Sequence, residues 1–91
     1  MTLHVKLFGM LKSLVGDQTD VTVALTDGNQ VRDLIVLFQA QYPKIGELLL
    51  NKKVIVSINH EIAHPETTIS STDEIAFLPP FAGGSGQLRS T

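Results

Sequence analysis

One amphipathic helix set between short alternating segments constrains the fold of this chain more than any other feature. Apolar residues recur at helical spacing from Val31 to Tyr42, and Pro43 then closes the element because proline lacks the N–H that a helix interior needs. The turn before this segment is predicted to supply an N-cap at Asp27 or Asn29. Since one helix can bury its apolar stripe only against another layer, the rest of the chain is expected to supply a sheet.

Strand periodicity precedes this helix. Residues 2–7 and residues 21–26 each alternate between apolar and polar side chains, which is the two-residue period of a strand with one buried face. The two segments are close enough in sequence to pair as a hairpin. Between them, residues 10–15 are bracketed by Gly9 and Gly16 and are predicted to form a helical turn or a loop.

Apolar and β-branched residues return after Pro43. Ile45 and residues 48–50 are predicted to form a short apolar connector. Residues 54–58 are expected to form a buried strand and residues 59–61 a turn. Residues 62–69 are expected to form a brief edge strand broken by Pro65, and residues 74–78 the last strand.

The order is therefore two strands, one helix, and two or three returning strands. It predicts an α+β fold with a mixed four- to five-stranded sheet and one main helix packed on one face. The ubiquitin-like β-grasp is the economical topology for this order, since handedness leaves few others. Residues 1–82 are expected to form this domain, and residues 83–91 a flexible C-terminal Gly-Gly arm with an extra tail.

Composition excludes several classes of function. The net charge is −2 and the seven basic residues are scattered, with Lys52 and Lys53 the only adjacent pair, so binding to nucleic acid is not expected. Without cysteine the chain has no disulfide, thiolate metal site or thiol nucleophile. The longest apolar run, residues 34–38, is too short to span a membrane. A cytoplasmic protein without membrane contact is expected.

His60, Glu61 and His64 match the H-E-x-x-H signature of zinc proteases. That mechanism needs a helix, because only there do residues four apart converge on one metal. Here the motif follows a strand, and Pro65 disfavours helical geometry at His64. A polar turn between strands is therefore the favoured interpretation, and no metal site is predicted.

The end of the chain is unusual for a small domain. The last strand runs into Pro79 and Pro80, which stiffen the backbone, and then into Gly83 and Gly84, which remove its side chains. Such a terminus is suited to insertion into a narrow site of another protein. A surface at its base formed by Phe8, Leu78 and Phe81 is the predicted docking surface, because aromatic anchors dominate interface energetics.

These residues resemble the small sulfur-carrier proteins with the ubiquitin-like fold, most closely the small subunit of molybdopterin synthase. The resemblance spans residues 3–84, and its C-terminal part is the most specific. It rests on the segments 5–9, 14–16, 31–34, 58–59 and 73–84.

The resemblance implies that the chain is not an enzyme on its own. An adenylyltransferase similar to the ubiquitin-activating enzyme would use MgATP to adenylate Gly84, and a sulfur source would then convert it to a thiocarboxylate. The chain itself would bind no cofactor. The synthase large subunit would receive the sulfur for the molybdopterin precursor. The residues implied to contact partners are Gly83, Ala82, Phe81, Pro80, Leu78 and Phe8.

The sequence departs from the family in one place, because residues 85–91 follow the second glycine and leave Gly84 without a free carboxylate. A processing peptidase could remove them, they could be an expression or fusion remnant, or the chain could have kept binding and lost sulfur transfer. Three further alternatives stay open: a carrier for thiamine, cysteine or a secondary metabolite, a ubiquitin-like protein modifier, and a plain binding module.

Overall fold

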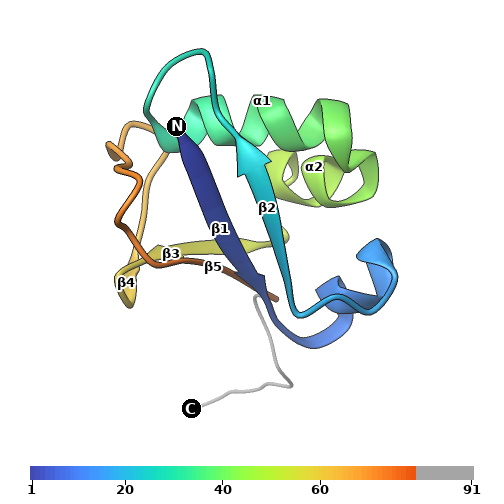
Figure 1. Ribbon diagram of the computed structural model, residues 1–91. Helices are drawn as coiled ribbons and strands as arrows, with labels where there is room; N and C mark the ends of the chain where they lie inside the picture. The colour runs from blue at the N-terminus through green and yellow to red at the C-terminus, as the bar shows by residue number, and fades with distance from the viewer. Residues whose placement is uncertain (80–91) are drawn as a thin grey trace.

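The alternating segments of the sequence form one sheet, and the helical segments cover one of its faces (Figure 1). The structure is a computed structural model that describes residues 1–79. In chain order the elements are β1 (Thr2–Leu7), the 3₁₀-helix η1 (Gly9–Val15), β2 (Asp20–Ala24), α1 (Val31–Gln41), α2 (Pro43–Leu50), β3 (Ile55–Ile58), β4 (Glu61–Ile62) and β5 (Ile75–Leu78).

The sheet has the strand order β2-β1-β5-β3-β4. The predicted hairpin is confirmed, since β1 and β2 pair antiparallel with Val5 opposite Val21. β5 lies parallel to β1 and antiparallel to β3, so the last strand of the domain is at its centre. The predicted α+β, ubiquitin-like β-grasp with a mixed sheet is confirmed.

The core lies between the sheet and the two helices. Alternate residues of each strand point toward the helices, and apolar burial is the main favourable term holding the layers together. Phe38 of α1 and Phe77 of β5 are both fully buried, and their rings meet edge to face with centroids 4.9 Å apart. This pair fixes the central strand against the main helix.

The N-cap of α1 is Gln30, so the prediction of Asp27 or Asn29 was wrong. The Gln30 N–H donates to Asp33 Oδ2 at 3.0 Å. The N–H groups of Val31 and Arg32 donate to main-chain carbonyls of the loop at residues 65–67. Tertiary contacts therefore satisfy donors that a local capping side chain would otherwise satisfy.

The predicted apolar connector after Pro43 was also wrong, because these residues form a second helix, α2. Pro43 ends α1 as expected but occupies the first turn of α2, where its missing N–H costs no hydrogen bond. The buried side chains of α2 include Ile45 and Leu49, which extend the core. None of the helices within residues 1–79 has the length and apolarity to span a bilayer.

The remaining elements differ from expectation mainly at their ends. η1 matches the predicted helical turn, and β3 and β5 each begin one residue later than predicted. The edge strand is confined to the two residues of β4, which begins at Glu61 within the predicted turn. The rest of the predicted range contributes a hydrogen bond from the Ala63 N–H to the Val56 carbonyl and the isolated bridge from Thr68 to Gln30.

Replacing Gly46 with alanine is expected to destabilise the fold by about 2 kcal/mol, although alanine is the better helix former. A Cβ at Gly46 would lie 2.5 Å from Gln39 Cα and 2.6 Å from its main-chain nitrogen, so α1 and α2 would have to separate. Chemical denaturation would measure the change. Lys44→Ala, at an exposed position of the same helix, is the control with little expected effect. A Gly46→Ala protein as stable as the parent would show that the two helices do not need this close approach.

Candidate functional site

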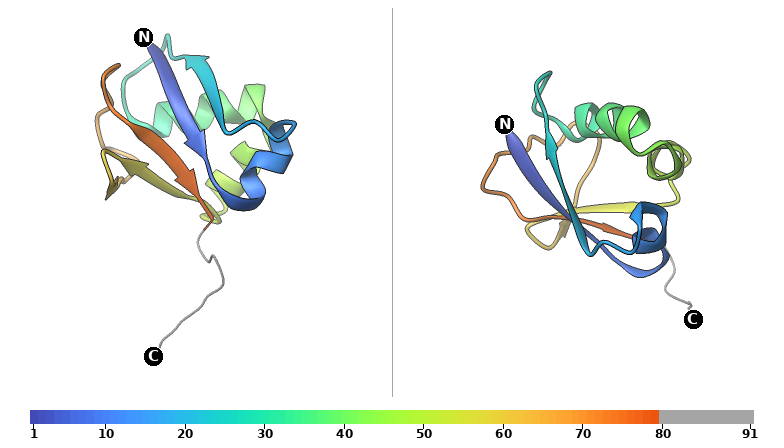
Figure 2. Two further views of the ribbon diagram at one scale, coloured as in Figure 1. Left: turned by 60° about the horizontal axis from the view of Figure 1, so that its bottom comes forward. Right: turned by 45° about the vertical axis from the view of Figure 1, so that its right-hand side comes forward.

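Figure 2 (left) shows the sheet in front of the helices. The sheet face turned away from the helices carries apolar side chains at one end, among them Phe8 and Leu78. Register places Leu78 of β5 opposite Ile55 of β3, and Phe8 follows directly after Leu7, which pairs with Phe77. Phe8 is 44% exposed, while Leu78 and Ile55 are half-buried. Together with Ala76 these residues form the surface that we call the docking face.

Phe8 and Leu78 are thus the two predicted docking residues that the structure describes, and it brings them together. Both line a hollow of about 180 Å³ on the outer face of the sheet. The other predicted site residues, Pro80, Phe81, Ala82, Gly83 and Gly84, lie outside the described residues.

A charged group borders the same hollow. Glu74 accepts from Lys6 Nζ at 3.3 Å through Oε2, and its Oε1 lies 3.5 Å from His60 Nε2. These side chains are exposed, so the pairs add little to stability.

The described chain ends at Pro79, at the edge of the docking face. The Phe8 N–H donates to the Phe77 carbonyl at 3.2 Å, which continues the contact of β1 and β5 beyond Leu7. Gly9 has a φ of +60°, and a Cβ there would lie 3.0 Å from Pro79 Cγ. A side chain at residue 9 would therefore press on Pro79. The core side chain of Phe77 and this close contact together fix the direction in which the chain leaves the domain.

The H-E-x-x-H segment is not helical, as predicted. Asn59 and His60 both have positive φ in the turn after β3, and Glu61 begins β4. His60 borders the hollow on the outer face, whereas His64 borders a cleft beside the helices, so the two rings do not converge. Within residues 1–79 no three His, Asp or Glu side chains are grouped as a metal site would need.

Sequence reasoning missed Ile55 and Ala76 as members of the docking face. Their positions in the strand alternation indicated the outward side, but only the pairing of β5 with β3 and β1 shows that they adjoin Phe8. Lys6, Glu74 and His60 were missed for the same reason.

Sequence comparison places most of the chain in one family. The model of the ThiS family matches residues 5–84. A molybdopterin synthase sulfur carrier subunit of Mycobacterium tuberculosis is 28% identical over 81 residues, which is 89% of this chain and 95% of that protein. The protein of the same description from Escherichia coli is 29% identical over 82 residues, which is 90% of this chain and 99% of that protein.

Solved structures share the fold. SAMP1 from Haloferax volcanii superposes with a TM-score of 0.72 at 24% identity, covering 92% of this chain and 100% of that one. CysO from Mycobacterium tuberculosis superposes with a TM-score of 0.71 at 22% identity, and the match covers 87% of this chain and 99% of CysO. A third structure is the complex of subunits 1 and 2 of the molybdopterin-converting factor from Helicobacter pylori. Its matching chain superposes with a TM-score of 0.62 at 22% identity, and the match covers 92% of this chain and 100% of that one. The family match, the β-grasp fold and the arm beside the docking face agree, and the chain belongs to the ThiS family of ubiquitin-like sulfur carriers.

Proposed function

We propose that this chain carries sulfur as a thiocarboxylate on Gly84 and donates it in the synthesis of molybdopterin. One observation supports this most directly: the central strand β5 ends at the docking residue Leu78, and Gly84 follows six residues later in the sequence. A partner that binds the docking face can therefore receive Gly84 within about 20 Å of Leu78. Such positioning is a large part of the catalysis of group transfer.

The chemistry needs no side chain of this protein. A carboxylate oxygen of Gly84 attacks the α-phosphorus of ATP, which releases pyrophosphate and leaves an acyl adenylate. A sulfide equivalent then attacks the Gly84 carbonyl and releases AMP. MgATP is bound by the activating adenylyltransferase. Since residues 85–91 hold the Gly84 carbonyl in an amide, the reaction begins only on a chain that ends at Gly84, and a peptidase would generate that end.

Two similarities favour molybdopterin as the destination. The two curated relatives above are both described as molybdopterin synthase sulfur carrier subunits. The complex from Helicobacter pylori joins a chain of this fold to subunit 2 of the same converting factor. The partner proposed here is accordingly a synthase large subunit, which would bind the docking face and take Gly84 into its active site.

Intact-mass spectrometry tests the carrier chemistry. A chain ending at Gly84 is incubated with the cognate adenylyltransferase, MgATP and a sulfur donor, beside the full 91-residue chain as a control. The shorter chain should gain the mass of one oxygen-to-sulfur exchange, and the full chain should gain nothing. An unchanged mass of the shorter chain, with an enzyme that activates its own carrier, would contradict the proposal.

The pathway is tested separately with the thiocarboxylated chain. Mixed with the cognate large subunit and the molybdopterin precursor, it should yield molybdopterin and return with a Gly84 carboxylate. Sulfur transfer to a thiamine or cysteine precursor instead would make it a carrier for another pathway. Isopeptide adducts between Gly84 and lysines of other proteins would make it a protein modifier.

A further inference from the structure

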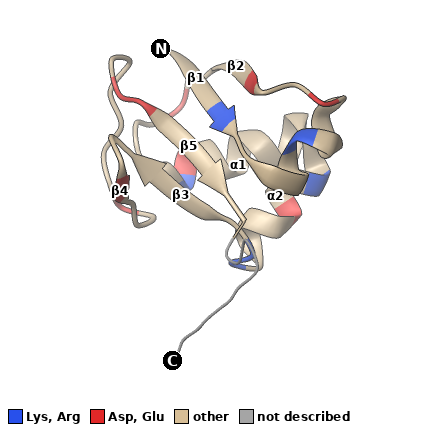
Figure 3. Cartoon of the chain, turned by 90° about the horizontal axis from the view of Figure 1, so that it is seen from below, with Lys and Arg blue, Asp and Glu red and all other residues tan. Residues whose placement is uncertain are grey.

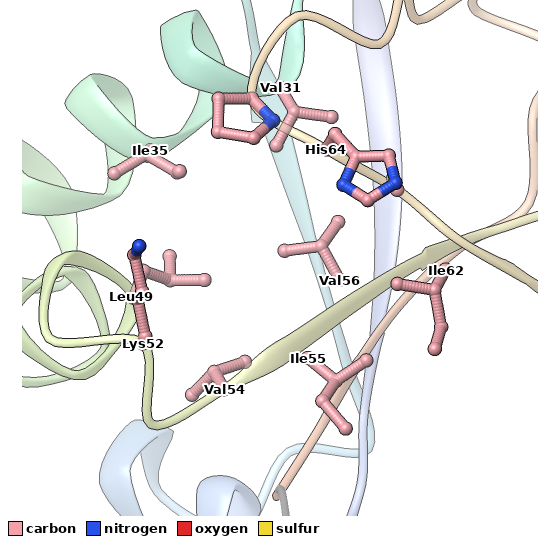
Figure 4. Close-up of a pocket in the computed structure, with 11 residues that line it drawn as sticks. Val31, Ile35, Leu49, Lys52, Val54, Ile55, Val56, Ile62 and His64 are labelled. Carbon is pink, nitrogen blue, oxygen red and sulfur yellow. The ribbon is translucent and has the colours of Figure 1, made fainter.

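A second hollow lies on the helix side of the sheet and shares Ile55 with the docking face. It has a volume of about 370 Å³ and opens between the two helices and β3. Figure 4 shows Ile35 and Leu49 reaching toward it from the helices, with Val54 and Val56 opposite them. Most of its lining is apolar, and we call it the edge cleft.

The strand beside the edge cleft is only partly paired. β4 pairs with Ser57 and Ile58 alone, and the Ala63 N–H adds one hydrogen bond to the Val56 carbonyl. Because main-chain groups alternate along a strand, those of Ile55 point toward β5, whereas those of Val54 point toward this edge; among residues 1–79 no strand pairs with Val54 there. A free strand edge next to an apolar hollow is the geometry used to bind an extended peptide, with main-chain hydrogen bonds at the edge and alternate side chains in the hollow.

The lining of the edge cleft includes one charged side chain, that of Lys52. Lys52 and His64 are the ionisable residues that line it, and no carboxylate does, although the chain carries a net charge of −2. Lys53 follows directly, and both lysines are exposed. Neither lysine takes part in the ion pairs found within residues 1–79. An acidic segment therefore complements this rim.

Lys52 also occupies a position where glycine is the favoured residue. Its φ is +58°, and it ends α2 in a Schellman motif: Lys52 N–H donates to the Leu49 carbonyl and Lys53 N–H to the Leu48 carbonyl. A side chain at this left-handed position is strained, whereas glycine is not.

The edge cleft adjoins the base of the arm. Because Ile55 pairs with Leu78, the start of β3 lies beside the end of β5. In Figure 3 the basic turn after α2 lies near the point where the described chain ends. The six residues from Pro79 to Gly84 span at most about 18 Å over their five Cα–Cα steps, so Gly84 stays within that distance of the base. An enzyme that encloses the arm would meet the docking face on one side and the edge cleft on the other.

We infer that the edge cleft docks an extended acidic segment of the activating adenylyltransferase, which adds to the free edge of β3. Apolar side chains of that segment occupy the cleft, and a carboxylate lies beside Lys52. This inference rests on the proposed sulfur-carrier function, since it names the enzyme that must hold Gly84.

Steady-state pyrophosphate exchange with the cognate adenylyltransferase tests the inference, using the chain ending at Gly84 as the varied substrate. Lys52→Glu should raise KM about tenfold with kcat unchanged, because attraction becomes repulsion. Ile35→Glu, which places a carboxylate in the cleft, should raise KM similarly. The matched controls are Lys44→Glu on α2 and Val36→Glu on α1, both exposed and outside the cleft lining. Their KM should change less than about twofold.

Lys52→Gly separates docking from a structural role. It relieves the strained backbone, so its melting temperature should rise, while docking requires that its KM rise too. A higher melting temperature with the parent KM would overturn the inference. Parent-like KM values for Lys52→Glu and Ile35→Glu would also overturn the inference, provided that the unsubstituted chain supports normal pyrophosphate exchange. If that chain ending at Gly84 supports no exchange at all, the proposed function itself fails.

Discussion

Replacing Phe77 with alanine is expected to lower the free energy of unfolding by about 3–5 kcal/mol, the range measured for fully buried phenylalanines. Phe77 is 0% exposed and meets the ring of Phe38, which in turn lies 5.3 Å from that of Tyr42. Removing it would leave a cavity between the central strand and α1. A domain of this size has roughly 5–13 kcal/mol in total, so the variant should be close to unfolding at physiological temperature.

Urea denaturation followed by circular dichroism measures this loss. Leu78→Ala is the matched control on the same strand, because Leu78 is only half-buried on the opposite face, and about 1 kcal/mol is expected there. Equal losses at the two positions would mean that the strand is held from both faces and that Phe77 is not the anchor of the arm.

Replacing Phe8 with aspartate is expected to weaken binding to the activating enzyme and to the large subunit by about 100-fold, as for a central aromatic anchor of an interface. Phe8 is already 44% exposed in the free chain, so the fold should lose little. The substitution also places a carboxylate beside Leu78 at the hollow that Glu74 borders. Isothermal titration calorimetry with each purified partner measures the change.

Val36→Asp is the control for this prediction, since Val36 is 62% exposed but lies on α1, away from the sheet's outer face. Its affinity should match that of the parent chain. If Phe8→Asp binds both partners as tightly as Val36→Asp does, the docking face is not the surface through which the arm is presented.

The docking face and the edge cleft lie on opposite sides of the same strand pair, and both adjoin the start of the arm. Contacts on one side alone would leave the arm free to pivot about Pro79. Contacts on both sides would hold its base during the adenylation of Gly84. The Phe8 and Lys52 substitutions test the two sides separately, and their effects on affinity should add because the two residues share no contact.

Local pattern gave good predictions where the local sequence decides the structure. The alternation at residues 2–7 and the helical spacing from Val31 depend on neighbouring residues, and both elements formed as expected. The cap of α1 was misassigned because its donors are satisfied by carbonyls of residues 65–67. α2 was missed because its short apolar run has no length to show a period, and it is stabilised by packing on α1 through Gly46.

The sequence by itself determined the class of the fold and the family to which the chain belongs. Alternation, one amphipathic helix and a di-glycine after a di-proline all lie in the order of residues along the chain. The tertiary structure alone decided which residues work together. Phe8 and Leu78 are joined by the parallel pairing of β1 and β5, and the edge cleft exists because β4 stops after two residues. Strand periodicity specifies the face on which a side chain lies, whereas the identity of its neighbour depends on register between strands that are far apart in the sequence.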